Sequence, residues 1–231
     1  MGLFDLFKAK KLKEDNTLHN GLYGYSEKHY KSIEDFVAKQ FGKFDNVYHE
    51  TMSFGVHLDM AVIPPSENAN FYKLVTLGMG SYKMNVPQSL KNEELERAEL
   101  VMFLPPNWDF SDLKGKDSWP ITVLKTFARM PLECNSWVGF DHTASLDKKN
   151  TPFAENTKLC SGLFLPVLSG QRLVTHRIEG LGKINFYVIV PLYEEELKQI
   201  FSEGTDKIIE KIDSKELSLI VDINRKNYAI E

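Results

Sequence analysis

Two small groups of side chains in this sequence could carry chemistry, and the first is His57 with Asp59. They stand two residues apart in an alternating stretch, so on a strand both side chains would point to one face. That geometry suits two metal ligands, or a general base with the carboxylate that orients it. A polar strand face that only makes hydrogen bonds is the simpler interpretation, because two ligands do not complete a metal site.

Cys134 and His142 form the second group. A thiol becomes a nucleophile when a nearby group activates it, and a histidine can be that group. Their spacing within an irregular segment matches no known signature, however, and cysteine is commonly a small buried hydrophobic residue. A metal- or thiol-dependent enzyme that uses His57, Asp59 and His142, or Cys134, is therefore a minor alternative.

The sequence patterns of other common chemistries are missing. Gly78-Met79-Gly80 has neither the third glycine of a dinucleotide fingerprint nor the Lys-Ser of a phosphate-binding loop. The sequence contains no Gly-x-Ser-x-Gly turn, no His-Glu-x-x-His and no paired cysteine spacing. We therefore expect no catalytic residues, no metal and no cofactor.

The composition bounds the class of protein. Of the 231 residues, 42% are hydrophobic and 26% charged, as in folded globular proteins, and the formal net charge is −4. This balance argues against the basic surface of a nucleic-acid-binding protein. Two cysteines, Cys134 and Cys160, are too few for a disulfide scaffold and fit a reducing compartment, so we expect a cytoplasmic protein.

Residues 1–20 are expected to form an N-terminal arm. No apolar run in the sequence approaches the ~20 residues of a membrane-spanning helix. The arm carries a short apolar cluster beside four lysines: Leu3, Phe4, Leu6, Phe7, Lys8, Lys10, Lys11 and Lys13. One such cluster binds membranes only marginally, so we expect a tail or an arm docked on its own domain, with membrane association as the lesser alternative.

Hydrophobic periodicity predicts the elements that must position these side chains. The expected helices run from Ser26 to Gly42, Ser118 to Pro131, Tyr193 to Phe201 and Gly204 to Ile212. The expected strands run from Val56 to Ile63, Phe71 to Leu77, Arg97 to Leu104, Leu159 to Val167 and Lys183 to Val190. The strand from Val56 should bury one face only, and an irregular region should fill residues 132–158. Residues 217–223 should form a last strand or a packed terminal segment.

The order of these elements predicts an α+β fold. Neighbouring strands with short links favour antiparallel pairing over crossover connections. We expect a mixed, largely antiparallel sheet with helices packed on it, similar to an α/β/α sandwich. No glycine- or proline-rich linker divides the chain, so residues 21–231 should form a single domain.

Six segments occur in the order found in the Suppressor of fused family. They are Phe71–Met79, Ala98–Leu104, Ser118–Arg129, Gly139–His142, Phe186–Leu197 and Ile220–Arg225. From about His49 to the C-terminus the chain resembles the Suppressor of fused domain, in its bacterial single-domain form. The family has no agreed catalytic set, so the resemblance implies a binding module and assigns no active-site roles.

The resemblance also implies a kind of partner. Animal members sequester a transcription factor by clamping a short extended peptide, and many bacterial members are regarded as immunity proteins that bind a toxin encoded beside them. The sequence lacks the additional C-terminal region of the animal proteins, which favours the bacterial role. We therefore expect a protein that neutralises a partner toxin by stoichiometric binding, with a regulatory or sequestering binder of another protein as the alternative.

The partner-binding residues are expected in the irregular region, because long loops often carry binding function. Trp137, Phe140, Asp141 and His142 combine aromatic anchors with polar groups, as protein interfaces do. The match to the family at Gly139–His142 leaves two roles open for Asp141 and His142: they hold the loop or they face the partner. Trp137 likewise either anchors a partner or fills the core edge.

Overall fold

A computed structural model describes residues 18–19, 21–111 and 115–230 of the chain. Eight strands form one sheet: β3 (Asn46–Tyr48), β4 (Asp59–Ile63), β5 (Tyr72–Leu77), β6 (Ala98–Leu104), β7 (Thr143–Ser145), β8 (Ser161–Pro166), β11 (Thr175–Ile178) and β12 (Gly182–Leu192). Their order is β3-β4-β5-β6-β12-β8-β7, with β11 beside β12. Neighbours are antiparallel except β6 and β12, so the predicted mixed, largely antiparallel sheet is confirmed.

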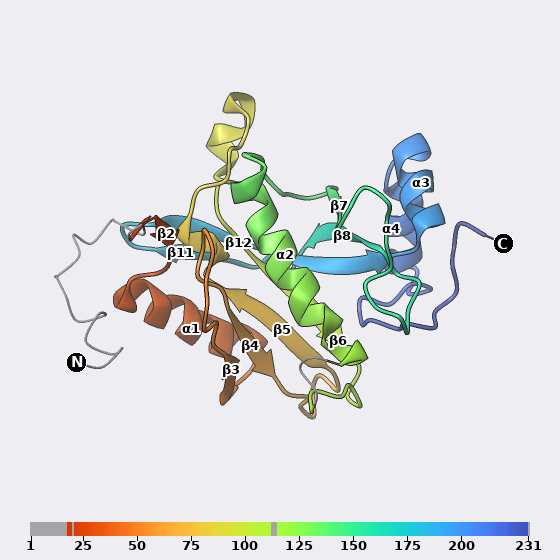
Figure 1. Ribbon diagram of the computed structural model, residues 1–231, viewed down its shortest axis with the longest axis horizontal. Coiled ribbons are helices and arrows are strands. Elements are labelled where there is room, and N and C mark those ends of the chain that lie inside the picture. The colour runs from red at the N-terminus through yellow and green to blue at the C-terminus, as the bar shows by residue number, and fades with distance from the viewer. Residues whose placement is uncertain (1–17, 20, 112–114, 231) are drawn as a thin grey trace.

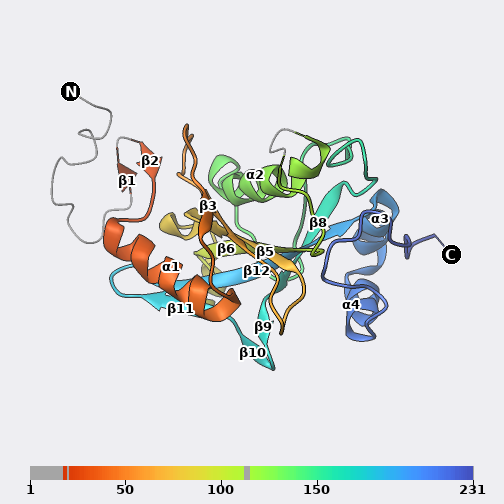
Figure 2. The same ribbon diagram turned by 90° about the horizontal axis from the view of Figure 1, so that it is seen from below.

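Helices cover both faces of this sheet. They are α1 (Glu27–Phe41), α2 (Trp119–Glu133), α3 (Glu194–Glu203) and α4 (Asp206–Asp213). Figure 1 shows α2 crossing one face, and Figure 2 shows α1 on the opposite face with α3 and α4 at the far end. The α+β sandwich predicted from the order of the elements is therefore confirmed.

Each helix buries an apolar stripe against its face of the sheet. On the α1 side, Ile33 and Val37 pack with Phe186. On the α2 side, Leu124 and Phe127 pack with Leu100 and other strand residues. Ser26 caps α1 by accepting a hydrogen bond from the His29 amide (3.3 Å), and the helix ends at Gly42 as predicted.

Two predicted elements differ from the structure. The strand expected from Val56 begins only at Asp59 and buries both faces, because α1 and α2 each cover one side of the sheet. The second helix continues through Pro131 to Glu133, and Ser118 does not cap it. A proline in the last turn removes only one helical hydrogen bond, so the helix tolerates it there.

Short elements were missed by periodicity. The hairpin of β1 (Leu18–His19) and β2 (Leu22–Tyr23) precedes α1, and β7 lies inside the region expected to be irregular. A second hairpin, β9 (Leu168–Ser169) and β10 (Arg172–Leu173), interrupts an otherwise continuous strand, since β8 and β11 pair with the same edge of β12. The predicted arm falls mainly on residues 1–17 and 20, which lie outside the described residues, so that division of the chain stays a prediction.

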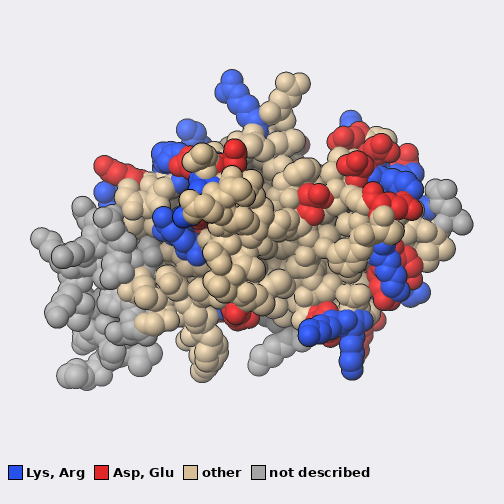
Figure 3. Space-filling model, turned by 90° about the horizontal axis from the view of Figure 1, so that it is seen from above, with Lys and Arg blue, Asp and Glu red and all other residues tan. Residues whose placement is uncertain are grey.

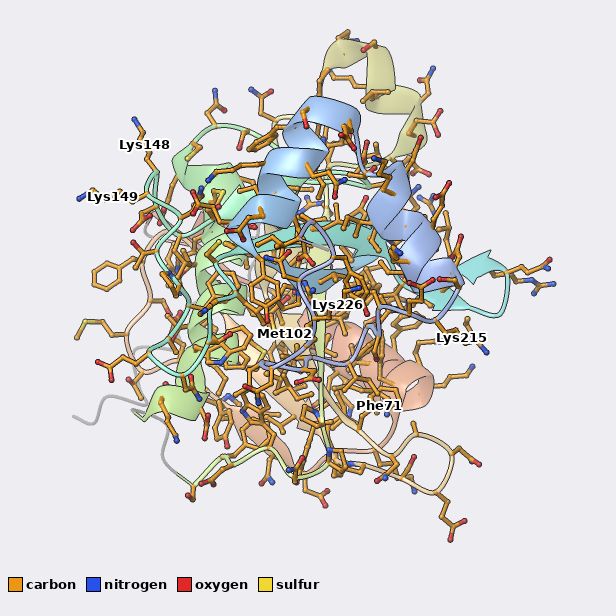
Figure 4. All side chains as sticks on the ribbon, turned by 90° about the vertical axis from the view of Figure 1, so that its right-hand side faces the viewer. Phe71, Met102, Lys148, Lys149, Lys215 and Lys226 are labelled. Atoms are coloured by element: carbon orange, nitrogen blue, oxygen red, sulfur yellow. The ribbon has the colours of Figure 1, made fainter. Side chains whose placement is uncertain are left out.

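The C-terminal segment (residues 214–230) is tied to α3 by a buried ion pair. Arg225 donates two parallel hydrogen bonds to the Glu196 carboxylate, at 2.6 and 2.5 Å, and a third to the Pro191 carbonyl at 2.8 Å. The side chain of Glu196 is fully buried and also accepts from the Tyr193 amide. Figure 4 views this end of the molecule, where the segment carrying Lys215 and Lys226 runs across the end of the sheet. The predicted terminal segment is thus packed, with one bridge from Ile220 to Phe103.

Replacing Arg225 by Met should leave the Glu196 carboxylate buried without its counter-ion. We expect the free energy of unfolding to fall by about 3–5 kcal/mol, measured by urea unfolding. Arg177→Met is the matched control, because Arg177 makes a similar pair with Glu94 in solvent and its loss should change little. Equal losses in the two variants would contradict a structural role for the buried pair.

Candidate functional site

The segment between α2 and β7 (residues 134–142) packs closely on itself. The ring of Trp137 meets the ring of His142 edge-on, with centroids 4.3 Å apart. A Cβ atom at position 139 would lie 2.5 Å from the Trp137 ring, so a larger residue there would displace the ring. Trp137 is partly buried and contacts the core on the α2 side. Trp137 therefore packs between the core and this segment, and part of its side chain remains exposed to solvent.

Backbone hydrogen bonds hold the same segment on strand β8. The Asp141 amide donates to the Phe164 carbonyl (3.1 Å), and the Phe164 amide donates to the His142 carbonyl (2.9 Å). Phe140 directly precedes these attachments, in a turn that the His142 amide closes on the Gly139 carbonyl (3.3 Å), and 56% of its surface is exposed. The structure thus presents an apolar side chain to solvent on a backbone turn that is held to β8 at its C-terminal side.

A hollow of about 470 Å³ lies beside this segment, over β7. Residues of α2, β7 and α3 line it, among them Met130, Cys134, Leu146 and the largely exposed Phe201. Within the described residues β7 pairs only with β8, so its outer edge is open. Seen from above, the centre of the molecule carries few charged side chains, whereas the end formed by α3 and α4 carries many (Figure 3).

His57 and Asp59 are brought together as predicted, with 3.1 Å between His57 Nε2 and Asp59 Oδ1. Asp59 is buried, and its two oxygens accept three further hydrogen bonds, from the Tyr30 hydroxyl, the His49 ring and the Glu50 amide, each at 3.0 Å. A carboxylate with four donors has no lone pair directed at a substrate or a metal. The pair therefore connects α1 to the chain around β4.

The hydrogen bonds also set the charge of this pair. Burial alone would raise the pKa of Asp59, but the bonds from His57, the Glu50 amide and His49 outweigh it and hold the pKa well below its usual value. The hydrogen bond to Asp59 raises the pKa of His57, against the opposite effect of burial. Both groups are thus favoured in their charged forms.

The other residues of the enzyme alternative do not join this pair. His142 precedes β7, which stands five strand spacings from β4 in the sheet, or about 24 Å at ~4.8 Å per strand. Cys134 is exposed after the end of α2 and lines the hollow over β7, whereas the ring of His142 packs against Trp137. A site built from His57, Asp59 and His142 is therefore excluded by their separation.

Sequence reasoning missed the buried carboxylate of Glu99 in the central strand β6. It accepts hydrogen bonds from the hydroxyls of Tyr25 and Thr76, both 2.6 Å, and from the amides of Gly78 and Gly80, at 3.0 and 3.1 Å. Burial raises the pKa of Glu99 against the effect of these four bonds. The glycine turn that lacks the phosphate-loop pattern thus cradles an internal carboxyl group. The sequence signal that could have revealed this buried group is a glutamate within a run of apolar strand residues.

Within the parts of the chain that the structure describes, no three His, Cys, Asp or Glu side chains are grouped to hold a metal ion. In the same residues, no helix has the length and apolar character needed to cross a membrane.

The cradle makes a specific prediction for Gly78. Its φ is +144°, and a Cβ atom would lie 2.0 Å from the His57 carbonyl oxygen, so Gly78→Ala should displace the turn. We expect a loss of about 3 kcal/mol or more in unfolding free energy, from the clash together with the backbone strain. Gly170→Ala is the control, because its φ is also positive (+62°) but nothing lies within 4 Å of the added atom. That variant should lose only about 1 kcal/mol, and equal losses would show that the close approach is unimportant.

Comparison with known proteins gives one relative in a bacterium and several similar folds. An uncharacterized protein of Ureaplasma parvum serovar 3 is 23% identical over 209 residues, covering 89% of this chain and 98% of that protein. A putative SUFU homolog from Neisseria gonorrhoeae has a TM-score of 0.60 at 15% identity, over 87% of this chain and 97% of that one.

Two further solved structures share the fold. A chain of the Sufu–Fu complex has a TM-score of 0.60 at 14% identity, covering 87% of this chain and 91% of its own length. Drosophila Suppressor of Fused has a TM-score of 0.57 at 13% identity, again over 87% of this chain but over 50% of that longer one. In sequence, residues 55–226 match the family described as Suppressor of fused protein (SUFU). This match spans most of the chain, and the protein therefore belongs to the Suppressor of fused family.

Proposed function

We propose that this protein is a non-catalytic module that binds a partner protein stoichiometrically, and that the partner docks on residues 137–142 and the open edge of β7. The observation that carries this proposal is the exposure of Phe140 on a backbone held by β8. A fixed aromatic anchor loses little conformational entropy on binding, and such residues dominate interface energies.

The surroundings of Phe140 support a protein partner. Asp141, exposed beside it, supplies a polar group for the rim of the interface, and the hollow over β7 offers space for an apolar side chain of the partner. One of the similar structures is a Sufu–Fu complex, which is a protein–protein assembly. The buried carboxylates Asp59, Glu99 and Glu196 are each satisfied by internal donors, which leaves them no role in turnover.

We further propose that the partner is a toxin domain, which is the kind of partner that the resemblance to bacterial immunity-type members of the family implies. The test is co-expression of the full chain with the product of the neighbouring open reading frame, followed by affinity capture and a growth assay. A stable one-to-one complex that restores growth supports this role. A captured partner without toxicity would instead support the regulatory or sequestering alternative.

Replacing Phe140 by Ala should weaken partner binding by about 2 kcal/mol, or roughly thirtyfold, without lowering the melting temperature. The physical reason is that Phe140 contacts solvent in the free protein, so its removal costs little packing. Leu168→Ala is the control: Leu168 is equally exposed (57%) but lies on the hairpin at the face opposite α2. A titration in which both variants bind alike would remove Phe140 from the interface.

Trp137→Ala tests the residue beneath that surface. We expect a loss of about 2 kcal/mol or more in binding, because Trp137 contributes ring surface and positions His142. A thermal melt beside the binding titration separates this role from core packing. If the melting temperature falls while the folded fraction binds with unchanged affinity, Trp137 is a packing residue, with an expected stability loss of about 3 kcal/mol.

A further inference from the structure

The loop between β3 and β4 (residues 49–58) carries two of the most exposed apolar side chains in the described structure. Met52 is 71% exposed and Phe54 is 69% exposed. The loop backbone is nevertheless attached at several points. The Tyr23 amide donates to the Gly55 carbonyl (2.8 Å), and Arg129 of α2 donates to the Phe54 carbonyl (3.3 Å). Because Met52 and Phe54 gain little packing from the rest of the protein, other contacts must hold the loop in this closed position.

The side chains of His49, Glu50, Ser53, His57 and Asp59 supply those contacts, and we name this set the latch. Asp59 connects both ends of the loop to α1, through His49, the Glu50 amide, His57 and the Tyr30 hydroxyl. Glu50 accepts from the Leu58 amide (3.2 Å) and from Arg129 (2.5 Å), which connects the loop to α2. The latch thus lies between the two large helices.

His57 determines how protons are shared within the latch. Its Nε2 faces Asp59 and its Nδ1 lies 2.7 Å from the Ser53 hydroxyl oxygen. When the His57 ring carries one proton, on Nε2, its Nδ1 can only accept a hydrogen bond from the Ser53 hydroxyl. With two ring protons it donates at both nitrogens, and the Ser53 hydroxyl is released to donate to Glu50, with which it also interacts. The second proton therefore completes a chain of bonds from Asp59 to Arg129.

We propose that the latch is proton-operated: it is closed while His57 carries its second proton, and it loosens the loop bearing Met52 and Phe54 when that proton leaves. The charged and titratable groups that face it are distributed over every neighbouring element. They are Asp59 of β4, His49 and Glu50 of the loop, Lys125 and Arg129 of α2, Tyr25 before α1, and Glu27, Tyr30, Lys31 and Glu34 of α1.

The direction of the pH dependence follows from the two shifted groups. The pKa of His57 is raised by folding, so its contribution is complete below about pH 6.5 and is lost as the pH rises through the raised value. The pKa of Asp59 is lowered, so its contribution is present above about pH 4 and is lost only in stronger acid. The latch is therefore tightest from about pH 4 to about 6.5 and loosens as the pH rises through the raised pKa of His57.

Nuclear magnetic resonance on the full chain between pH 5.5 and 8.5 tests this proposal. We expect the His57 ring to titrate above ~6.5 and the hydrogen-exchange protection of the Leu58 amide to fall through the same range. The fall should be about tenfold for each unit by which the pKa exceeds that value. A His57 ring that titrates at or below ~6.5, or a protection factor independent of pH, would overturn the proposal.

Three variants assign the effect to one residue. His57→Gln can still donate to Asp59 but does not titrate, so the pH dependence of Leu58 protection should disappear. His176→Gln is the control, because His176 is another partly buried histidine, located 2.9 Å from Ser32 at the contact of α1 with β11, and its loss should leave the profile unchanged. His49→Gln tests separately the other histidine ring that bonds to Asp59. A profile that persists in His57→Gln overturns the proposal, and if that variant does not fold, the titration of the natural protein decides.

Discussion

The burial of the Glu99 carboxylate in the central strand is the constraint on which much of this structure depends. A carboxyl group without hydrogen-bond partners in the middle of a sheet would cost a large part of the net stability of a domain, so the partners of Glu99 must be in place whenever the protein is folded. They come from three places: Tyr25 ahead of α1, Thr76 on β5 and the turn at Gly78–Gly80. The position of α1 on its face of the sheet is thereby connected to the central strands.

Buried carboxylates also join distant parts of the chain at two other places. Asp59 joins α1 to the loop before β4, and Glu196 joins α3 to the C-terminal segment through Arg225. Each is surrounded by donors from segments far apart in sequence. These polar contacts fix how the helices and the C-terminal segment sit on a sheet whose apolar packing alone would be less directional.

Periodicity located the helices and the long strands, but it could not show which strands are covered on both faces. The stripe of α1 was visible because Ile33, Val37 and Phe41 recur on one face that alone meets the core. Strand β4 was mistaken for a half-exposed strand, since alternation in sequence cannot reveal that a second helix covers the other face. The donors of Glu99 and Glu196 lie elsewhere in the chain, and a single sequence carries no signal that pairs them.

The candidate binding surface was proposed from composition, and the structure adds how its residues are held. Aromatic and polar residues at positions 137–142 marked the segment, whereas the division of roles between Trp137 and Phe140 depends on attachment to β8, which sequence spacing does not encode. Residues before position 55, including Tyr25 and Tyr30, lie outside the family match yet complete the polar centre of this fold.

The hairpin of β9 and β10 has a practical consequence. Because β8 and β11 pair in line with one edge of β12, and Val174 closes the hairpin base on Val167 (2.8 Å), the register of the sheet is fixed independently of the hairpin tip. Chain inserted at Gly170, where no atom lies within 4 Å of an added Cβ, would extend into open solvent at a modest entropic cost. The tip is therefore a natural position for a fluorescent label or a fused reporter domain, on the face of the sheet opposite α2 (Figure 2).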